Sequence, residues 1–140
     1  GAERITGVDL SSRMLAQAGA CGAYDDLIHA DITPWLASAL RQDDLVLAAD
    51  VFIYVGVLEP VFAGVARVLA PGGLFAFSVE ELPGDEDLRL MPSLRYAHSE
   101  AYVRRLAQAH GMQVRHMLRA PIREDQRRPI EGLYVYLAGR

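Results

Sequence analysis

Apolar positions along the chain form two alternating patterns, short continuous runs and longer runs with helical spacing. Four continuous runs predict β-strands, at residues 4–9, 26–32, 45–49 and 74–79. Helical spacing predicts helices at residues 11–18, 33–40, 57–69 and 99–110. Strands that alternate with helices are typical of an α/β fold whose sheet is mostly parallel.

Local residue chemistry marks where several of these elements begin and end. Ser11, Ser12 and Ser99 precede apolar helical runs and are candidate N-caps. Gly19, Gly22 and Gly111 are candidate stops at the ends of such runs. The Pro71-Gly72-Gly73 segment predicts a sharp turn before the strand at residues 74–79.

The end of the chain carries a different pattern. Two further apolar runs, residues 112–118 and 133–137, are separated by a charged segment that includes Arg123 and Arg128. We expect that segment to be a solvated loop. It is too short for a parallel crossover, so an antiparallel hairpin is predicted. The fold class is therefore α/β, a Rossmann-like, mostly parallel sheet with an antiparallel C-terminal strand.

The strand at residues 45–49 is the centre of the predicted site. It has no polar alternation, so we expect both of its faces to be covered. Ligands of open α/β sheets bind beyond the carboxyl ends of the strands. This rule brings the residues after the strand to the rim of a site, namely Ala49, Asp50, Phe52 and Tyr54.

Composition narrows the class of protein. The chain has 140 residues, 51% of them hydrophobic, which suits one domain with a sizeable core. A net charge of -4 disfavours a nucleic-acid surface built on bulk positive charge. A single cysteine, no signal-peptide pattern and no long apolar span predict a cytoplasmic protein without a membrane segment. The histidine–acid pairs His29/Asp31 and His98/Glu100 have no third ligand at a defined spacing, so no metal site is predicted.

Four segments, taken in order, resemble the class I S-adenosylmethionine-dependent methyltransferases: Gly7–Ser11, His29–Ile32, Asp44–Tyr54 and Arg67–Leu74. The resemblance covers most of the chain and implies a partial methyltransferase domain over residues 1–140. Tyr96–Ser99 and Pro129–Tyr136 are similar to domains that act on small molecules or proteins and are in some cases joined to tetratricopeptide repeats.

The resemblance implies S-adenosyl-L-methionine as cofactor and assigns residues to it. In the family an acid after the second strand binds the ribose hydroxyls, which matches Asp9, with Leu10 beside it. The acid after the next strand contacts the adenine amino group, which matches Asp31, and Ile32 then lies against the adenine ring. Ala49 and Asp50 match positions that flank the methionine portion of the cofactor.

The same resemblance implies modest demands on the catalytic residues. The sulfonium already activates the methyl group, so the protein needs to position the acceptor and remove a proton. Candidate bases are His98, because imidazole titrates near neutrality, and Tyr54, on the acceptor side, with Glu80 and Glu81 as further choices. The Asn/Asp-Pro-Pro-aromatic signature of nucleic-acid amino-methylating enzymes is missing after residue 49. The expected acceptor is therefore a small molecule or a protein.

One departure from the family pattern leads to a further expectation. No GxGxxG motif occurs, so the family's first strand and its glycine-rich loop are absent from this sequence. Neighbouring strands then lose backbone partners, and we expect these 140 residues alone to bind S-adenosylmethionine weakly or not at all. A non-catalytic interaction module with this fold is one alternative. A nicotinamide-dependent dehydrogenase is another, but it leaves the Pro71–Gly73 turn and the antiparallel end unexplained.

Overall fold

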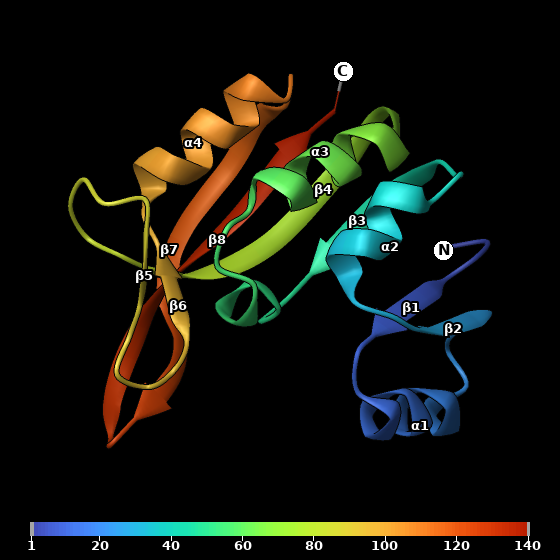
Figure 1. Ribbon diagram of the computed structural model, residues 1–140, viewed down its shortest axis with the longest axis horizontal. Helices are drawn as coiled ribbons and strands as arrows, with labels where there is room; N and C mark the ends of the chain where they lie inside the picture. The colour runs from blue at the N-terminus through green and yellow to red at the C-terminus, as the bar shows by residue number, and fades with distance from the viewer. Residues whose placement is uncertain (1, 140) are drawn as a thin grey trace. The chain divides into compact units, whose positions relative to one another are not determined.

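The computed structural model describes residues 2–139 (Figure 1). The chain divides into two compact units, Gly1–Ala39 and Leu40–Arg140. Within residues 2–139, every helix is too short or too polar to cross a membrane.

The first unit is a small α/β structure. Its elements are β1 (Thr6–Asp9), α1 (Ser12–Cys21), β2 (Asp26–His29) and α2 (Ile32–Ser38). Strands β1 and β2 pair in parallel, as predicted. The Ser11 hydroxyl accepts a hydrogen bond from the Met14 N–H, and Gly22 ends α1 with a φ of 74°. Of the candidate caps and stops for this helix, Ser11 and Gly22 are confirmed, whereas Ser12 and Gly19 lie within the helix.

The second unit contains a six-stranded mixed sheet and two longer helices. Its elements are β3 (Asp43–Ala48), η1 (Phe52–Tyr54), α3 (Glu59–Val68), β4 (Leu69–Glu81), β5 (Leu88–Leu90), β6 (Tyr96–His98), α4 (Glu100–Ala109), β7 (Gln113–Asp125) and β8 (Arg128–Ala138). β4 pairs in parallel with β3 and β6 and antiparallel with β8, while β5–β6 and β7–β8 are antiparallel pairs. The α/β class and the antiparallel C-terminal hairpin are confirmed, whereas the sheet is mixed.

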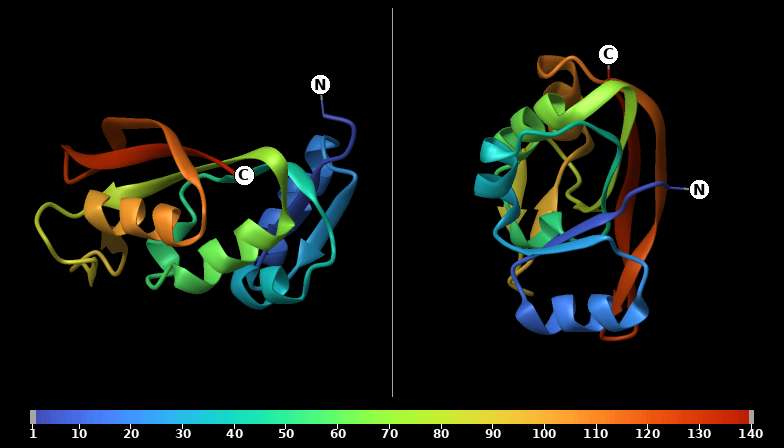
Figure 2. Two further views of the ribbon diagram at one scale, coloured as in Figure 1. Left: turned by 90° about the horizontal axis from the view of Figure 1, so that it is seen from above. Right: turned by 90° about the vertical axis from the view of Figure 1, so that its right-hand side faces the viewer.

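An aromatic cluster lies between α3 and β4. Figures 1 and 2 show α3 and α4 beside each other on one face of the sheet. From α3, the buried ring of Phe62 packs edge-on against Phe75 and Phe77, with centroids 5.5 and 5.7 Å away, and Phe52 of η1 joins them. This contact fixes both the helix and the loop after β3 to the central strand.

The C-terminal hairpin is longer than the sequence pattern predicted. β7 and β8 continue to a two-residue turn, Gln126 and Arg127, whose φ angles are 49° and 63°. Both values match the primed turns that join twisted antiparallel strands. The charged segment is therefore mostly strand rather than a solvated loop, because polar side chains are compatible with the open faces of a hairpin. Between β4 and β6, the short strand β5 pairs antiparallel with β6.

Two further features differ from expectation around β3. Ala48 is buried, but Leu45 and Leu47 are 55% and 67% exposed. Alternate residues of a strand share a face, so one face of β3 is open within the second unit and the prediction of two covered faces is wrong there. The Pro71–Gly73 turn lies inside β4, where Asp43 pairs with Leu69 and Leu45 already pairs with Leu74.

Candidate functional site

The loop between β3 and α3 (residues 49–58) is held at its beginning by two side chains. Asp50 has a φ of 57°, and its N–H donates a 2.9 Å hydrogen bond to the buried hydroxyl of Ser78 on β4. Its carboxylate accepts a 2.9 Å hydrogen bond from Arg123 on β7. These contacts fix the position where the chain leaves the sheet.

Arg123 also pairs with a second carboxylate. Its Nη1 donates to Glu80 Oε1 at 2.7 Å, and the side chains of Arg123 and Glu80 are only 15% and 10% exposed. Removal of either partner would leave a charge largely desolvated, which is costly. Sequence reasoning missed Ser78 and Arg123 as supports of this loop, because only the long hairpin brings Arg123 back to β4.

The far end of the loop is held from the junction of β6 and α4. His98 Nε2 lies 2.6 Å from the carbonyl oxygen of Gly56. Gly56 has a φ of 78°, and a Cβ at this position would come within 3.0 Å of the Tyr96 ring. The conformation and the close approach both require glycine.

His98 is fully buried, and its ring nitrogens differ in their partners. A carbonyl oxygen only accepts, so Nε2 carries the hydrogen and Nδ1 is the acceptor. Within residues 2–139, Nδ1 is the one fully buried side-chain polar atom without a partner. Burial lowers the pKa of His98, while the hydrogen bond to Gly56 opposes that shift. The imidazole is therefore neutral near pH 7.

Tyr102 of α4 fixes the start of α3. Its hydroxyl accepts a 2.9 Å hydrogen bond from the Leu58 N–H and donates one of 2.5 Å to the Glu59 carboxylate. Its ring stacks on His98, with centroids 6.1 Å apart and planes 7° from parallel. Burial, together with the Glu59 hydrogen bond, raises the pKa of Tyr102 above its ordinary value.

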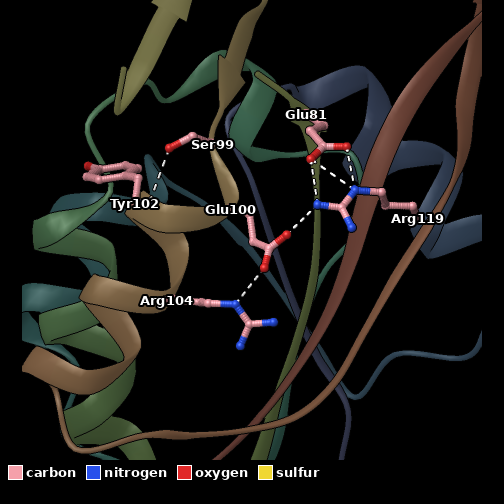
Figure 3. Close-up of polar contacts among 6 residues, drawn as sticks. All are labelled: Glu81, Ser99, Glu100, Tyr102, Arg104 and Arg119. Carbon is pink, nitrogen blue, oxygen red and sulfur yellow. Dashed lines mark hydrogen bonds and ion pairs between the residues drawn. The ribbon is translucent and has the colours of Figure 1, made fainter. Parts of the chain in front are cut away.

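An ion-pair network, shown in Figure 3, joins β7 to the end of β4 and the start of α4. Arg119 donates to both carboxylate oxygens of Glu81, at 2.9 and 3.0 Å, and also to Glu100, which pairs with Arg104. The hydrogen bonds that Arg119 donates to Glu81 and Glu100 raise its pKa. Beside the network, Ser99 caps α4 as predicted by accepting from the Tyr102 N–H.

The other predicted site residues of the second unit follow β3 directly. Ala49 and Asp50 are exposed at the end of the strand. Tyr54 is 68% exposed at the end of η1, whereas Phe52 and Ile53 point into the core. Tyr54 thus faces outward, while the preceding residues of η1 are packed in the core.

The predicted site residues of the first unit lie at its strand ends. Asp9 Oδ1 accepts a 2.8 Å hydrogen bond from the Ser11 N–H, and its other oxygen has no partner among residues 2–139. Asp31 is exposed and caps α2 by accepting from the Thr33 N–H at 3.2 Å. Leu10 is 67% exposed and Ile32 is half-buried.

No three His, Cys, Asp or Glu side chains come together as metal ligands anywhere in residues 2–139.

Proteins with solved structures resemble the chain closely in fold. An N-methyltransferase, NodS from Bradyrhizobium japonicum WM9 in complex with S-adenosylhomocysteine, matches 98% of this chain and 67% of its own, with a TM-score of 0.72 and 16% identity. A putative S-adenosylmethionine-dependent methyltransferase from Listeria monocytogenes matches 100% of this chain and 82% of its own, with a TM-score of 0.78 and 18% identity.

Magnesium protoporphyrin IX methyltransferase from Synechocystis PCC 6803, with bound S-adenosylmethionine, matches 98% of this chain and 60% of its own, with a TM-score of 0.67 and 16% identity. The architecture is thus an α/β methyltransferase-like fold. No curated protein sequence matches the chain. Residues 1–77, more than half of the chain, match the model of a family described as a methyltransferase domain. The chain belongs to this family of S-adenosylmethionine-dependent methyltransferases, as the sequence motifs indicated.

Proposed function

We propose that the protein transfers a methyl group from S-adenosylmethionine to a small-molecule or protein acceptor, and that residues 1–140 are part of its methyltransferase domain. The observation that carries this proposal is Asp9, an acid at the carboxyl end of β1 inside the matched segment, with one carboxylate oxygen unpartnered among the described residues. Such an oxygen is available to accept hydrogen bonds from a ribose diol.

The residues of the first unit fit a nucleoside in their chemistry. Asp9 Oδ1 is fixed by the Ser11 N–H, which orients the second oxygen for the ribose hydroxyls. We assign Leu10 to the same end of the cofactor. Asp31 uses one oxygen to cap α2, so its other oxygen can accept from the adenine amino group, and the half-buried Ile32 supplies an apolar contact for the ring.

The residues of the second unit are assigned to the methionine portion and the acceptor. When bound, the cofactor supplies a methyl group activated by its sulfonium. We assign Ala49 and Asp50 to the methionine portion, on a loop whose start is fixed by Ser78 and Arg123. The task of these residues is positioning, which can supply much of the rate enhancement of a reaction between preassembled partners.

Tyr54 and His98 receive different roles on the acceptor side. Tyr54 is exposed and we assign it to contact with the acceptor. The Nε2–H of His98 is engaged by Gly56, and the ring is fully buried. We therefore assign His98 to positioning the loop, in place of the proton-accepting role expected of an imidazole that titrates near neutrality.

Two strand edges support the finer prediction about the sheet. Within residues 2–139, β1 pairs with β2 alone and β3 pairs with β4 alone. We propose that the open edge of β3 accepts a further strand, which in the family's Rossmann-like sheet is the first strand. Cofactor binding by the 140 residues is then weaker than that of a protein that also supplies this strand.

The test is isothermal titration with S-adenosylhomocysteine. It uses the complete gene product, including any residues that its gene encodes before Gly1, and compares it with the 140 residues alone. We expect Asp9→Asn to weaken binding by about tenfold, as for loss of a charge-assisted hydrogen bond. Asp44→Asn, an exposed acid at the start of β3, is the control and should bind normally. Absence of binding by the complete protein would favour the non-catalytic interaction module instead.

A further inference from the structure

A pocket of about 200 Å³ lies in the second unit at the carboxyl end of β4. Three elements contribute to it: the end of β4, the turn between β5 and β6, and the far end of the β7–β8 hairpin. Its charged lining residues are Glu80, Arg95, Arg123 and Asp125. Its apolar lining residues are Met91, Pro92 and Ile130. The pocket thus combines an apolar wall with a few convergent charges, as small-molecule sites commonly do.

Glu80 has one carboxylate oxygen available to the pocket. Its side chain is 10% exposed, and Oε1 accepts the 2.7 Å hydrogen bond from Arg123. Oε2 has no partner in residues 2–139. Among these residues, His98 Nδ1 is the single fully buried side-chain polar atom without a partner. Glu80 Oε2 is therefore not fully buried. A fixed carboxylate with one open oxygen is a ready acceptor for an O–H or N–H group.

Arg95 supplies the unpaired cation. Met91 N–H donates to the Arg95 carbonyl at 2.9 Å, and this turn presents Arg95 to the pocket. The side chain is half-buried and makes no hydrogen bond or ion pair within residues 2–139. A guanidinium has five donors in a planar fork that matches a carboxylate.

The other charged residues of the pocket neither neutralise Arg95 nor offer a second unpaired cation. Arg123 is already paired with Glu80 and Asp50, so its charge is offset. Asp125 lies at the exposed end of the hairpin and is not paired with Arg95. A ligand that satisfies the pocket therefore carries a hydrogen-bond donor for Glu80 and an anionic group for Arg95.

We propose that this pocket binds the methyl acceptor and that the acceptor is a small carboxylic acid carrying a hydroxyl or amino group. Glu80 Oε2 accepts a hydrogen bond from that group, Arg95 binds the carboxylate, and Met91, Pro92 and Ile130 surround the apolar body. The inference rests on the proposed methyl transfer and adds the chemical class of the acceptor to it.

Three matched compounds test the inference in the complete gene product by NMR titration. Para-hydroxybenzoate has both groups, para-methoxybenzoate lacks the donor, and para-hydroxybenzamide lacks the charge. We expect the first to bind about tenfold more tightly than either of the others, as for one charge-assisted hydrogen bond. Arg95→Gln should reduce its affinity to that of the amide. Glu80→Gln keeps an acceptor but loses the charge, so it should reduce the preference for hydroxyl over methoxy. Arg104→Gln, on α4 outside the pocket, is the control.

Equal affinities for the three compounds, or an unchanged affinity in Arg95→Gln, would overturn the inference. The Arg95 side chain has no partner to lose among residues 2–139, so that variant should fold normally even if Glu80→Gln does not. Titration of the same protein with S-adenosylhomocysteine distinguishes failure of the proposed acceptor class from failure of the proposed methyl transfer. Cofactor binding without the compound preference refutes the acceptor class alone. A compound preference without cofactor binding refutes the proposed function, and the acceptor role of the pocket with it.

Discussion

The Nε2–H of His98 donates a hydrogen bond to the carbonyl oxygen of Gly56, which lies 42 residues earlier in the chain. The bond joins the β6–α4 junction to the loop that carries Tyr54. It also fixes the tautomer of a fully buried imidazole whose other nitrogen has no partner in residues 2–139. Protonation of that nitrogen would place an uncompensated charge in the core.

Stability should therefore depend on pH through His98. Burial lowers the pKa of His98 in the folded state below its ordinary 6.5, so the unfolded chain binds the proton first. The free energy of unfolding is expected to be highest above pH 6.5 and to fall at lower pH until the folded-state pKa is passed. The contribution of one group is at most about 1.4 kcal/mol per pH unit.

The measurement is urea denaturation between pH 7.5 and pH 5, chosen as about one unit above and 1.5 units below the ordinary histidine pKa. His98→Gln keeps an N–H donor for Gly56 but cannot titrate in this range. Its stability should decline less steeply toward acid pH than that of the unmodified protein. Identical slopes would show that His98 is not the titrating group.

A second prediction concerns the glycine that accepts this bond. Gly56→Ala combines a positive φ with a Cβ only 3.0 Å from the Tyr96 ring. Gly72→Ala is a matched control, because its φ of 75° is almost the same as 78° but nothing lies within 4 Å. We expect both variants to be destabilised by about 1 kcal/mol from backbone strain, and Gly56→Ala by about 1–3 kcal/mol more from the clash. Equal losses in thermal unfolding would argue against the contact with Tyr96.

Local chemistry made part of this fold predictable from the sequence. Ser11, Ser99 and Gly22 act within a few residues of themselves, so their capping roles were visible in the sequence. The side chains that hold the β3–α3 loop could not be predicted in this way. Arg123 pairs with Glu80 across 43 residues, and Asp50 bonds to Ser78 across 28. Those pairings depend on the length of a hairpin whose polar strands resemble a loop.

The site residues likewise divide into those that a sequence motif indicates and those that depend on distant contacts. The matched segment of the family model includes Asp9, Asp31 and Asp50, so motif order was enough to assign the family. The buried His98 bonds to the carbonyl oxygen of Gly56, which lies 42 residues away in the sequence. No local sequence pattern distinguishes such a histidine from a surface histidine before a helix cap. The roles of these residues toward cofactor and acceptor stay predictions that the titrations above test.

A third prediction compares two arginines that differ in burial. Arg123→Gln leaves Glu80, whose side chain is 10% exposed, without its ion-pair partner. Arg89→Gln removes the ion pair with Glu86, in which both side chains are well solvated, at 54% and 52% exposed. We expect a loss of about 3 kcal/mol for Arg123→Gln and a much smaller loss for Arg89→Gln in the free energy of unfolding. Urea denaturation near pH 7 measures both, and similar losses would contradict the burial argument.

The last prediction concerns the Tyr102 hydroxyl, which bridges α4 and the first turn of α3. Tyr102→Phe keeps the stacked ring but leaves the buried Leu58 N–H without its acceptor. The Glu59 carboxylate is exposed and recovers water, so the cost should come mainly from Leu58, at about 1–3 kcal/mol. Tyr134→Phe is the matched control, because that hydroxyl donates to Pro121 at 3.2 Å in an exposed position and its loss should cost at most about 0.5 kcal/mol.

Amide hydrogen exchange separates this effect from a general loss of stability. In Tyr102→Phe the Leu58 amide should exchange faster relative to amides in the middle of β4, since only its own hydrogen bond has been removed. Tyr134→Phe should leave that ratio unchanged. If Leu58 and the β4 amides accelerate together, the hydroxyl stabilises the whole unit rather than the start of α3, and the bridge between the two helices is not its main effect.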